Sequence, residues 1–151
     1  MEFNYNDDEG VDNFINTEIQ CNYVSPDEHC TERDELSVMC FNIQSMNTKW
    51  DRFKSELLSS EVSNSVMGFC ETHLIDAYER LYTLDGYELF TSNVASNKGG
   101  VCLYAQHNLN SKLRADLVVI KEYIETIFID CIIKNKTITI GRIYHHPGLM
   151  Y

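Results

Sequence analysis

The sequence lacks the segments that would carry a protein into or across a membrane. Nowhere among its 151 residues does an apolar run approach the roughly 20 residues that a membrane-spanning helix needs. The first thirty residues are acidic and lack the basic and apolar regions of a signal peptide. We therefore expect no membrane partner and no secretion, and we place the protein in the nucleus or the cytoplasm.

Basic residues are also scarce. There are 12 Lys and Arg residues against 23 Asp and Glu residues, which gives a net charge of −11. This balance argues against a nucleic-acid partner, because binding phosphate groups requires positive charge. However, the first 35 residues hold 11 acidic residues and one basic residue, and the rest of the chain carries a net charge of only −1. A nearly neutral body neither demands nor excludes a nucleic-acid substrate.

A zinc-binding arrangement of cysteine and histidine is missing as well. Cys21 and Cys30 lie near His29 in a polar segment, but their spacing matches no zinc motif. The other four of the six cysteines lie in apolar, strand-like runs, where a thiol behaves as a small apolar side chain: Cys40, Cys70, Cys102 and Cys131. We expect all of them to be structural or incidental thiols.

What is present divides at about residue 35. Residues 1–35 have scattered apolar positions, no sustained period and strong negative charge, so they bury too little surface to offset chain entropy. We predict a disordered acidic tail there, with a short helix over residues 11–19 as one option. The tail is either a solvated leader or a partner-binding arm. Residues 36–151 form the folded part and contain no internal repeat.

The folded part opens with a strand, a helix and a second strand. Residues 36–43 and 66–70 are short apolar runs of the kind that form buried strands. Between them, Thr48 and Asp51 have the spacing of a helix N-cap and its reciprocal acid, and the helix ends at residues 59–60. Two strands joined by one helix predict a parallel pair with a right-handed crossover. Four apolar side chains recur at helical spacing and form one stripe toward the core: Trp50, Phe53, Leu57 and Leu58.

The remainder of the chain predicts antiparallel strands. Strand-like runs cover residues 86–91, 101–106, 124–133 and 137–144, with a loop over 92–100, and the run 101–106 alternates. The fold class is therefore α/β with a mixed, largely antiparallel sheet. In each of the last two runs, alternate side chains share one face of the strand: Ile127, Ile129, Cys131 and Ile133 on the first, and Ile138, Ile140, Arg142 and Tyr144 on the second.

Two polar side chains close the predicted parallel strands. Asn42 ends the first strand and Glu71 follows the second. The carboxyl ends of parallel strands meet at one edge of a sheet, where α/β proteins usually build their sites. Mg²⁺ prefers oxygen ligands and binds with few protein carboxylates plus water. Glu71, with Asn42 beside it, is therefore a candidate metal site, although a turn residue and a solvated acid fit the same spacing.

Short motifs occur in a fixed order along the folded part. They are CFNIQSM at residues 40–46, FCETHL at 69–74, LDGY at 84–87 with GGV at 99–101, and ET at 125–126 with GRIYHHP at 141–147. Together they resemble the endonuclease/exonuclease/phosphatase family, and most of all the endonuclease domains of non-LTR (LINE-type) retrotransposons. The resemblance runs from Leu36 to the C-terminus. It implies part of an α/β sandwich and Mg²⁺- or Mn²⁺-dependent hydrolysis of DNA phosphodiester bonds.

The resemblance also implies roles for individual residues. Glu71 would bind the divalent metal, and Asn42 would help to hold that ligand, the metal or the scissile phosphate. Tyr144 would donate its hydroxyl hydrogen toward charge developing on the phosphate. Without the resemblance, Tyr144 reads as an aromatic residue that packs at a strand end. His145 and His146 follow that tyrosine, and we interpret both as loop residues.

The second half of the family pattern is not found in this sequence. The family continues into a Gly-Asp-x-Asn motif, another acidic residue and a Ser-Asp-His ending, and the chain contains neither Asp-x-Asn nor Asp-His. We therefore expect residues 36–151 to be the N-terminal half of the domain. Because catalytic groups that act as a unit fail together, we expect the isolated chain to be inactive and doubt that it binds metal alone.

Three interpretations of function remain open. The first is a truncated retrotransposon-type endonuclease, whose partners would be DNA and the missing C-terminal half or a reverse transcriptase domain. The second is a non-catalytic binding module that keeps the same fold and uses its acidic tail to contact a basic partner. The third is a phosphodiesterase of the same family that acts on a phosphate ester outside nucleic acid.

Overall fold

A computed structural model describes the chain at residues 36–60, 63–92, 99–121 and 123–146. The chain divides into two units, Met1–Arg33 and Asp34–Tyr151, and every described residue belongs to the second. The predictions for the tail, its optional helix, Cys21 and Cys30 therefore lie outside the described residues. Within the described ranges, no helix has the length and apolar character needed to cross a membrane.

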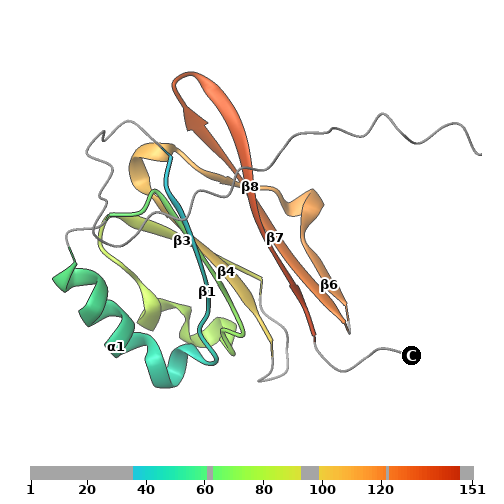
Figure 1. Ribbon diagram of the computed structural model, residues 1–151. Helices are drawn as coiled ribbons and strands as arrows, with labels where there is room; N and C mark the ends of the chain where they lie inside the picture. Colours follow the sequence, from blue (N-terminus) through green and yellow to red (C-terminus); the bar gives the residue numbers. More distant parts are fainter. Residues whose placement is uncertain (1–35, 61–62, 93–98, 122, 147–151) are drawn as a thin grey trace, which may run out of the picture. The chain divides into compact units, whose positions relative to one another are not determined.

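The first sheet confirms the predicted strand–helix–strand unit. Strands β1 (Val38–Asn42) and β2 (Val66–Cys70) pair in parallel, and helix α1 (Met46–Ser59) connects them. Strands β4 (Val101–Gln106) and β3 (Tyr87–Ser92) complete the sheet in antiparallel pairing, in the order β1-β2-β4-β3 (Figure 1). The parallel pairing brings the carboxyl ends of β1 and β2 to the same edge, as the sequence predicts.

Helix α1 begins two residues before the predicted N-cap. Thr48 is inside the helix, where its hydroxyl donates a 3.3 Å hydrogen bond to the carbonyl of Ser45, so its prediction as N-cap is wrong. The backbone N–H groups of Ser45 and Met46 instead donate to the carbonyls of Glu71 and Thr72, at 2.7 and 2.9 Å. Backbone carbonyls after β2 therefore accept the first helical N–H and the one before it, at a helix start without a capping side chain.

One face of α1 covers the first sheet. Trp50 is buried, and Phe53 and Leu57 pack partly buried against the same cluster. Leu58 is 71% exposed, so its place in the predicted apolar stripe is wrong. Adjacent helical residues differ by roughly 100° around the axis, which turns Leu58 away from the face that holds Leu57.

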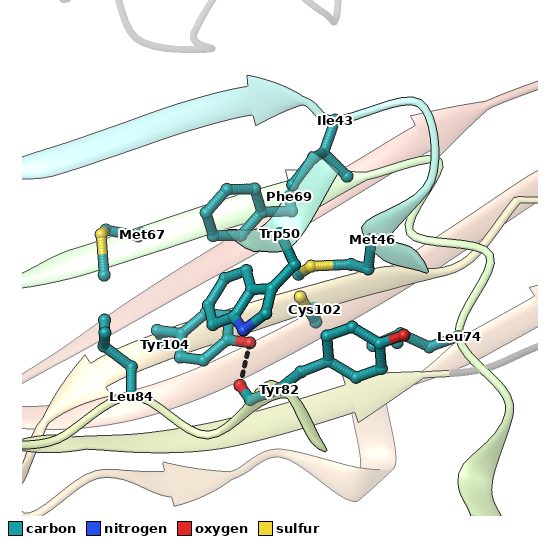
Figure 2. Close-up of a cluster of buried hydrophobic side chains, with 10 residues drawn as sticks. All are labelled: Ile43, Met46, Trp50, Met67, Phe69, Leu74, Tyr82, Leu84, Cys102 and Tyr104. Carbon is teal, nitrogen blue, oxygen red and sulfur yellow. Dashed lines mark hydrogen bonds between the residues drawn. The ribbon is translucent and has the colours of Figure 1, made fainter. Parts of the chain in front are cut away.

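The core under α1 is rich in aromatic rings (Figure 2). The rings of Trp50 and Tyr104 stack with centroids 5.4 Å apart, and the phenol of Tyr104 donates a 2.5 Å hydrogen bond to the carbonyl of Tyr82. This bond satisfies a hydroxyl that would otherwise be costly to bury. The cluster comprises Ile43, Met46, Trp50, Met67, Phe69, Leu74, Tyr82, Leu84, Cys102 and Tyr104.

The second sheet is built around a long hairpin. Strands β7 (Ile124–Ile133) and β8 (Lys136–His145) pair along their whole length, close to the predicted bounds. Two short strands that the sequence did not predict, β5 (Lys112–Leu113) and β6 (Val119–Lys121), pair with β7 on its other side. Within the described residues, β8 pairs only with β7 and forms an edge of this sheet. Three 3₁₀ turns complete the described elements: η1 (Asp76–Tyr82), η2 (His107–Leu109) and η3 (Ala115–Leu117).

A second core joins the two sheets. It contains Val66, Cys70, Val101, Leu103, Ala105, Leu109, Ile127, Ile129 and Cys131. Strand β4 is buried along Val101–Ala105, because α1 covers one of its faces and the second sheet covers the other. The predicted alternation of β4 therefore does not produce a solvent-facing side. The shared face predicted for β7 is confirmed and packs in this core. The α/β class is also confirmed, with the strands divided between two sheets.

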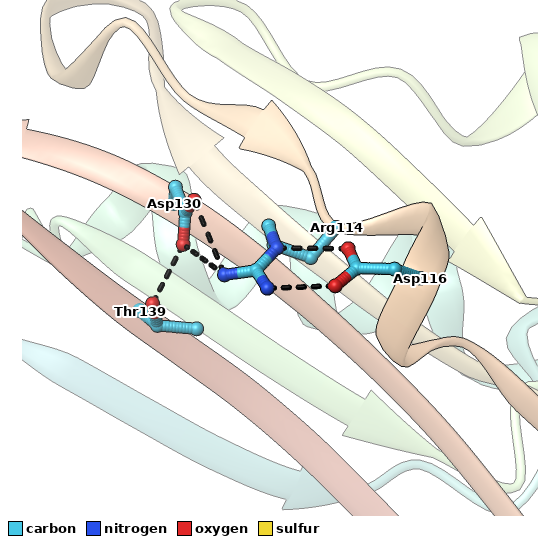
Figure 3. Close-up of polar contacts among 4 residues, drawn as sticks. All are labelled: Arg114, Asp116, Asp130 and Thr139. Carbon is cyan, nitrogen blue, oxygen red and sulfur yellow. Dashed lines mark hydrogen bonds and ion pairs between the residues drawn. The ribbon is translucent and has the colours of Figure 1, made fainter.

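A polar cluster lies on the opposite face of β7 (Figure 3). Arg114 donates to both carboxylate oxygens of Asp116, at 2.8 and 2.7 Å, and its third nitrogen lies 3.5 Å from Asp130. Thr139 of β8 donates a 2.6 Å hydrogen bond to Asp130. The cluster ties the segment after β5 to both strands of the hairpin.

Candidate functional site

The three residues singled out in the sequence meet at one place. The amide nitrogen of Asn42, at the end of β1, donates a 2.7 Å hydrogen bond to Oε1 of Glu71. The phenol of Tyr144, from β8, donates a 2.9 Å hydrogen bond to the same oxygen. Strand ends from both sheets thus place an amide, a carboxylate and a phenol within hydrogen-bonding distance.

The hydrogen bonds assign different parts to Asn42 and Glu71. The amide oxygen of Asn42 accepts the backbone N–H of Gln44 at 3.1 Å, so that oxygen is already engaged. Glu71 is half-buried, and none of the described Lys, Arg or His side chains forms an ion pair with it. Its Oε2 accepts no hydrogen bond from a described residue. Among these residues, Glu71 therefore has an anionic oxygen available to bind a metal ion, and Asn42 orients the Glu71 carboxylate.

The donor set suits a hard cation that keeps most of its water. The described residues contain no group of three His, Cys, Asp or Glu side chains that could together hold a metal. Mg²⁺ nevertheless binds through one or two carboxylates, with water and substrate phosphate completing its coordination. Glu71, which forms no ion pair with a described residue, fits that pattern, whereas a single carboxylate does not fit a closed zinc site.

Tyr144 stays protonated at neutral pH. Burial raises the pKa of its phenol to about 12, and the hydrogen bond to Glu71 and the negative charge of that carboxylate act in the same direction. A protonated phenol is a hydrogen-bond donor, which is what stabilising developing negative charge requires. Tyr144 is therefore suited to donate a hydrogen bond to Glu71 or to an anion placed beside it.

The backbone around Glu71 has an uncommon conformation. Glu71 and His73 both have φ of 53°, in the left-handed region that costs a residue with a side chain roughly 1–2 kcal/mol. The N–H groups of Thr72 and His73 donate to the carbonyls of Gly100 and Gly99, at 3.2 and 2.9 Å, and these bonds hold the segment in place. Such conformations persist where the surrounding structure fixes them, and they are frequent at functional sites.

A fourth polar residue, Glu125 of β7, lies beside the site. Its side chain is completely buried, accepts the Gly100 N–H at 2.5 Å and lies 2.6 Å from the ring nitrogen of His146. Sequence reasoning assigned no role to Glu125. The available signal was its parity, because it precedes Ile127 and Ile129 on the inward face of a strand, where an isolated carboxylate is unexpected.

The two histidines were both interpreted as loop residues, and the structure separates them. His145 is the last residue of β8 and pairs with Ile124, so that interpretation is wrong for His145. His146 follows the strand, and its ring packs against Tyr144 with centroids 4.8 Å apart. His146 therefore belongs to the site, through Glu125 and Tyr144, although it lies outside a regular element.

The chain was compared with known proteins once this geometry was established. No protein-family model and no curated protein matches the sequence. Among solved structures, the chain is similar to the AP endonuclease LMAP from Leishmania major, with a TM-score of 0.54 and 13% sequence identity over 75% of this chain. The described part of the chain is an α/β fold consistent with part of the endonuclease/exonuclease/phosphatase type. At this identity the similarity shows the fold alone, and the match covers 40% of the Leishmania enzyme.

Proposed function

We propose that this chain carries the first part of a Mg²⁺- or Mn²⁺-dependent endonuclease domain whose ancestral reaction is hydrolysis of DNA phosphodiester bonds. The hydrogen-bonded group of Asn42, Glu71 and Tyr144 carries this proposal. The endonuclease/exonuclease/phosphatase-type fold supports it, and the ordered motifs favour the non-LTR retrotransposon type. The partners would be DNA and the C-terminal half of the domain or a reverse transcriptase domain, in the nucleus or the cytoplasm.

Each residue has a distinct task in this proposal. Glu71 would hold the divalent ion, which when bound supplies positive charge that polarises a phosphate oxygen. Asn42 keeps the carboxylate oriented, since its amide donates to Oε1 and its own oxygen is held by Gln44. Tyr144 stays protonated, and its phenol, which donates to Glu71 in the structure, would donate instead to charge that develops on the phosphate.

Metal binding by the purified full chain tests the proposal. Because the second half of the family pattern is not in the sequence, we expect calorimetric titration with Mn²⁺ to show one weak site only. That site should be lost in Glu71→Gln, because a neutral amide is a poor ligand for a hard cation. Glu88→Gln is the matched control, since Glu88 is an exposed carboxylate on β3, at the other edge of the first sheet. Equal Mn²⁺ binding by Glu71→Gln and the unchanged chain would contradict the proposal. A stable chain that binds no metal would favour the binding-module interpretation.

We also predict that the chain alone does not nick DNA. The sequence has no Asp-x-Asn and no Asp-His, so the groups that the family uses to activate water and stabilise the transition state are not in it. The measurement is Mg²⁺-dependent conversion of supercoiled plasmid to open circles, with Glu71→Ala as the comparison. Nicking by the unchanged chain that disappears in Glu71→Ala would show that the present residues suffice. Reading the transcript past the codon for Tyr151 complements this test, because a Gly-Asp-x-Asn motif and a reverse transcriptase would support the retrotransposon type.

A further inference from the structure

We propose that Glu125 is a positioning residue that fixes Glu71 and Tyr144 in their relative orientation. The proposal rests on the proposed function, because Glu71 is taken as the metal ligand. Glu125 itself is completely buried and cannot contact a substrate or a metal in solvent. Its effect runs through two routes, one through the backbone of the glycine pair and one through His146.

The first route reaches the backbone of the segment that follows β2. Glu125 accepts the N–H of Gly100, while the carbonyls of Gly99 and Gly100 accept the N–H groups of His73 and Thr72. These bonds hold the two residues that follow Glu71. Glu125 therefore anchors the glycine pair, and the pair anchors the left-handed conformation that directs the Glu71 side chain toward Asn42 and Tyr144.

Gly99 shows how closely this anchor is fitted. A Cβ atom at Gly99 would overlap Oε1 of Glu125 and lie 2.7 Å from a ring carbon of His146. The glycine also has φ of 77°, which a residue with a side chain rarely adopts. Position 99 therefore requires glycine for two separate reasons: the close approach of Glu125 and His146, and the positive φ.

The second route reaches the ring of Tyr144. Glu125 lies directly opposite Tyr144 in the β7–β8 pairing, and its carboxylate holds the His146 ring at 2.6 Å. That ring packs edge-on against Tyr144, with centroids 4.8 Å apart. The His146 ring, which Glu125 holds in place, therefore restricts the position of the Tyr144 ring while the Tyr144 phenol donates to Glu71.

A buried carboxylate needs hydrogen-bond partners to be stable in the fold, whether or not it affects the site. A role of Glu125 in stability alone therefore has to be distinguished from a role in positioning Glu71 and Tyr144. Burying a charge is unfavourable unless hydrogen bonds and opposite charge compensate it. The described partners of Glu125 are Gly100 and His146, and both lead to the candidate site. A structural role predicts a change in stability alone, whereas positioning predicts a change at Tyr144 in a chain that remains folded.

The first experiment compares two glycine substitutions. Gly99→Ala and Gly86→Ala both place a side chain at a positive φ, but nothing lies within 4 Å of a Cβ at Gly86. The readout is the ¹³Cζ resonance of Tyr144 in the metal-free full chain, assigned with Tyr144→Phe. Glu71→Ala supplies the position of that resonance when the hydrogen bond to Glu71 is lost, because alanine has no acceptor. We expect Gly99→Ala to move the resonance toward the Glu71→Ala position and Gly86→Ala to leave it unchanged. A folded Gly99→Ala chain with an unchanged Tyr144 resonance would overturn the proposal.

The second experiment changes Glu125 itself. Glu125→Ala should move the Tyr144 resonance further than Glu125→Gln, because glutamine keeps one acceptor oxygen and nearly the same volume. Asp130→Asn is the matched control, since Asp130 lies on β7 but on its opposite face. If Glu125→Ala does not fold, Glu125→Gln and Gly99→Ala decide the question. Equal resonances in Glu125→Gln, Asp130→Asn and the unchanged chain would refute positioning.

Mn²⁺ titration of the same variants keeps this proposal distinct from the proposed function. If Glu71 binds the metal and Glu125 positions it, Glu125→Gln should weaken Mn²⁺ binding at least tenfold while Asp130→Asn leaves it unchanged. If the unchanged chain binds no Mn²⁺, the proposed function fails, and the Tyr144 resonance still decides whether Glu125 orders the group. Unchanged Mn²⁺ affinity in a folded Glu125→Gln chain would count against positioning.

Discussion

At the scale of single residues, burial separates thiols that the sequence treats alike. Cys40 is exposed on β1, whereas Cys70, Cys102 and Cys131 are buried. Burial raises the pKa of the Cys102 thiol well above its usual range, and it also raises the pKa of Cys131. Since the thiolate is the reactive form, a buried thiol with a raised pKa reacts slowly.

We predict that Cys40 is alkylated first among these four. Brief treatment of the native chain with iodoacetamide at pH 8 should modify Cys40, because it alone of the four is exposed. The other three should react only after unfolding. Mass spectrometry of the digested protein assigns each modification to its cysteine. Labelling of Cys102 as fast as Cys40 in the native chain would show that the core under α1 opens readily.

A second residue-scale prediction concerns Tyr104. Burial raises the pKa of its phenol far above the usual value of 10.0. Above pH 10 the unfolded chain therefore releases this proton while the native chain keeps it, so stability falls as the pH rises. Urea denaturation between pH 8 and pH 11 should show a decreasing midpoint, with a shallower decrease in Tyr104→Phe. The same slope in both proteins would mean that other groups cause the loss.

At the scale of elements, the hairpin of β7 and β8 contains one contact of unusual closeness. Gly141 lies opposite Phe128, and a Cβ at that glycine would overlap the phenylalanine ring. We predict that Gly141→Ala destabilises the fold by about 1–3 kcal/mol, because the half-buried ring of Phe128 would have to move to make room for the extra carbon atom. Urea denaturation measures the loss. Thr137→Ala, at an exposed position of β8, is the control. Equal stability of the two variants would contradict the prediction that the contact between Gly141 and Phe128 excludes a side chain at position 141.

The same element shows what the sequence can and cannot reveal. The strands 124–133 and 136–145 were predictable, because alternation of apolar side chains is a local pattern. The start of α1 was not, since the groups that cap it are the carbonyls of Glu71 and Thr72, which no local pattern displays.

The candidate site was predictable in part for a related reason. Asn42 and Glu71 end adjacent parallel strands, so topology alone brings them together. Glu125 was missed because its partners are Gly100 and His146, which lie 25 and 21 residues away in the chain. Their meeting depends on how the second sheet packs on the first, and this packing does not follow from the pattern of any one strand.

At the scale of the whole described unit, the two cores share strands. Met67 and Phe69 of β2 face the core under α1, while Val66 and Cys70 of the same strand face the core between the sheets. Loss of packing in one core therefore affects the strand that supports the other. The two cores should unfold together.

The single tryptophan allows this to be tested. Trp50 reports on the core under α1, whereas Ile129 is completely buried in the core between the sheets. Ile129→Ala should lower the midpoint of the Trp50 fluorescence transition, corresponding to a loss of about 2–5 kcal/mol. Ile120→Ala, at an exposed site on β6, is the control. An unchanged Trp50 transition in Ile129→Ala would show that the cores unfold separately.

Strand β8 has a practical consequence for handling the protein. Within the described residues no strand pairs with the outer edge of this ten-residue strand, and Ile138 and Ile143 are exposed on it. An uncovered, β-prone edge of this length recruits strands from other molecules, which is how ordered aggregates begin. Concentrated preparations should therefore become turbid and bind thioflavin T sooner than preparations of the Ile138→Lys variant. Storage at low concentration is the corresponding precaution.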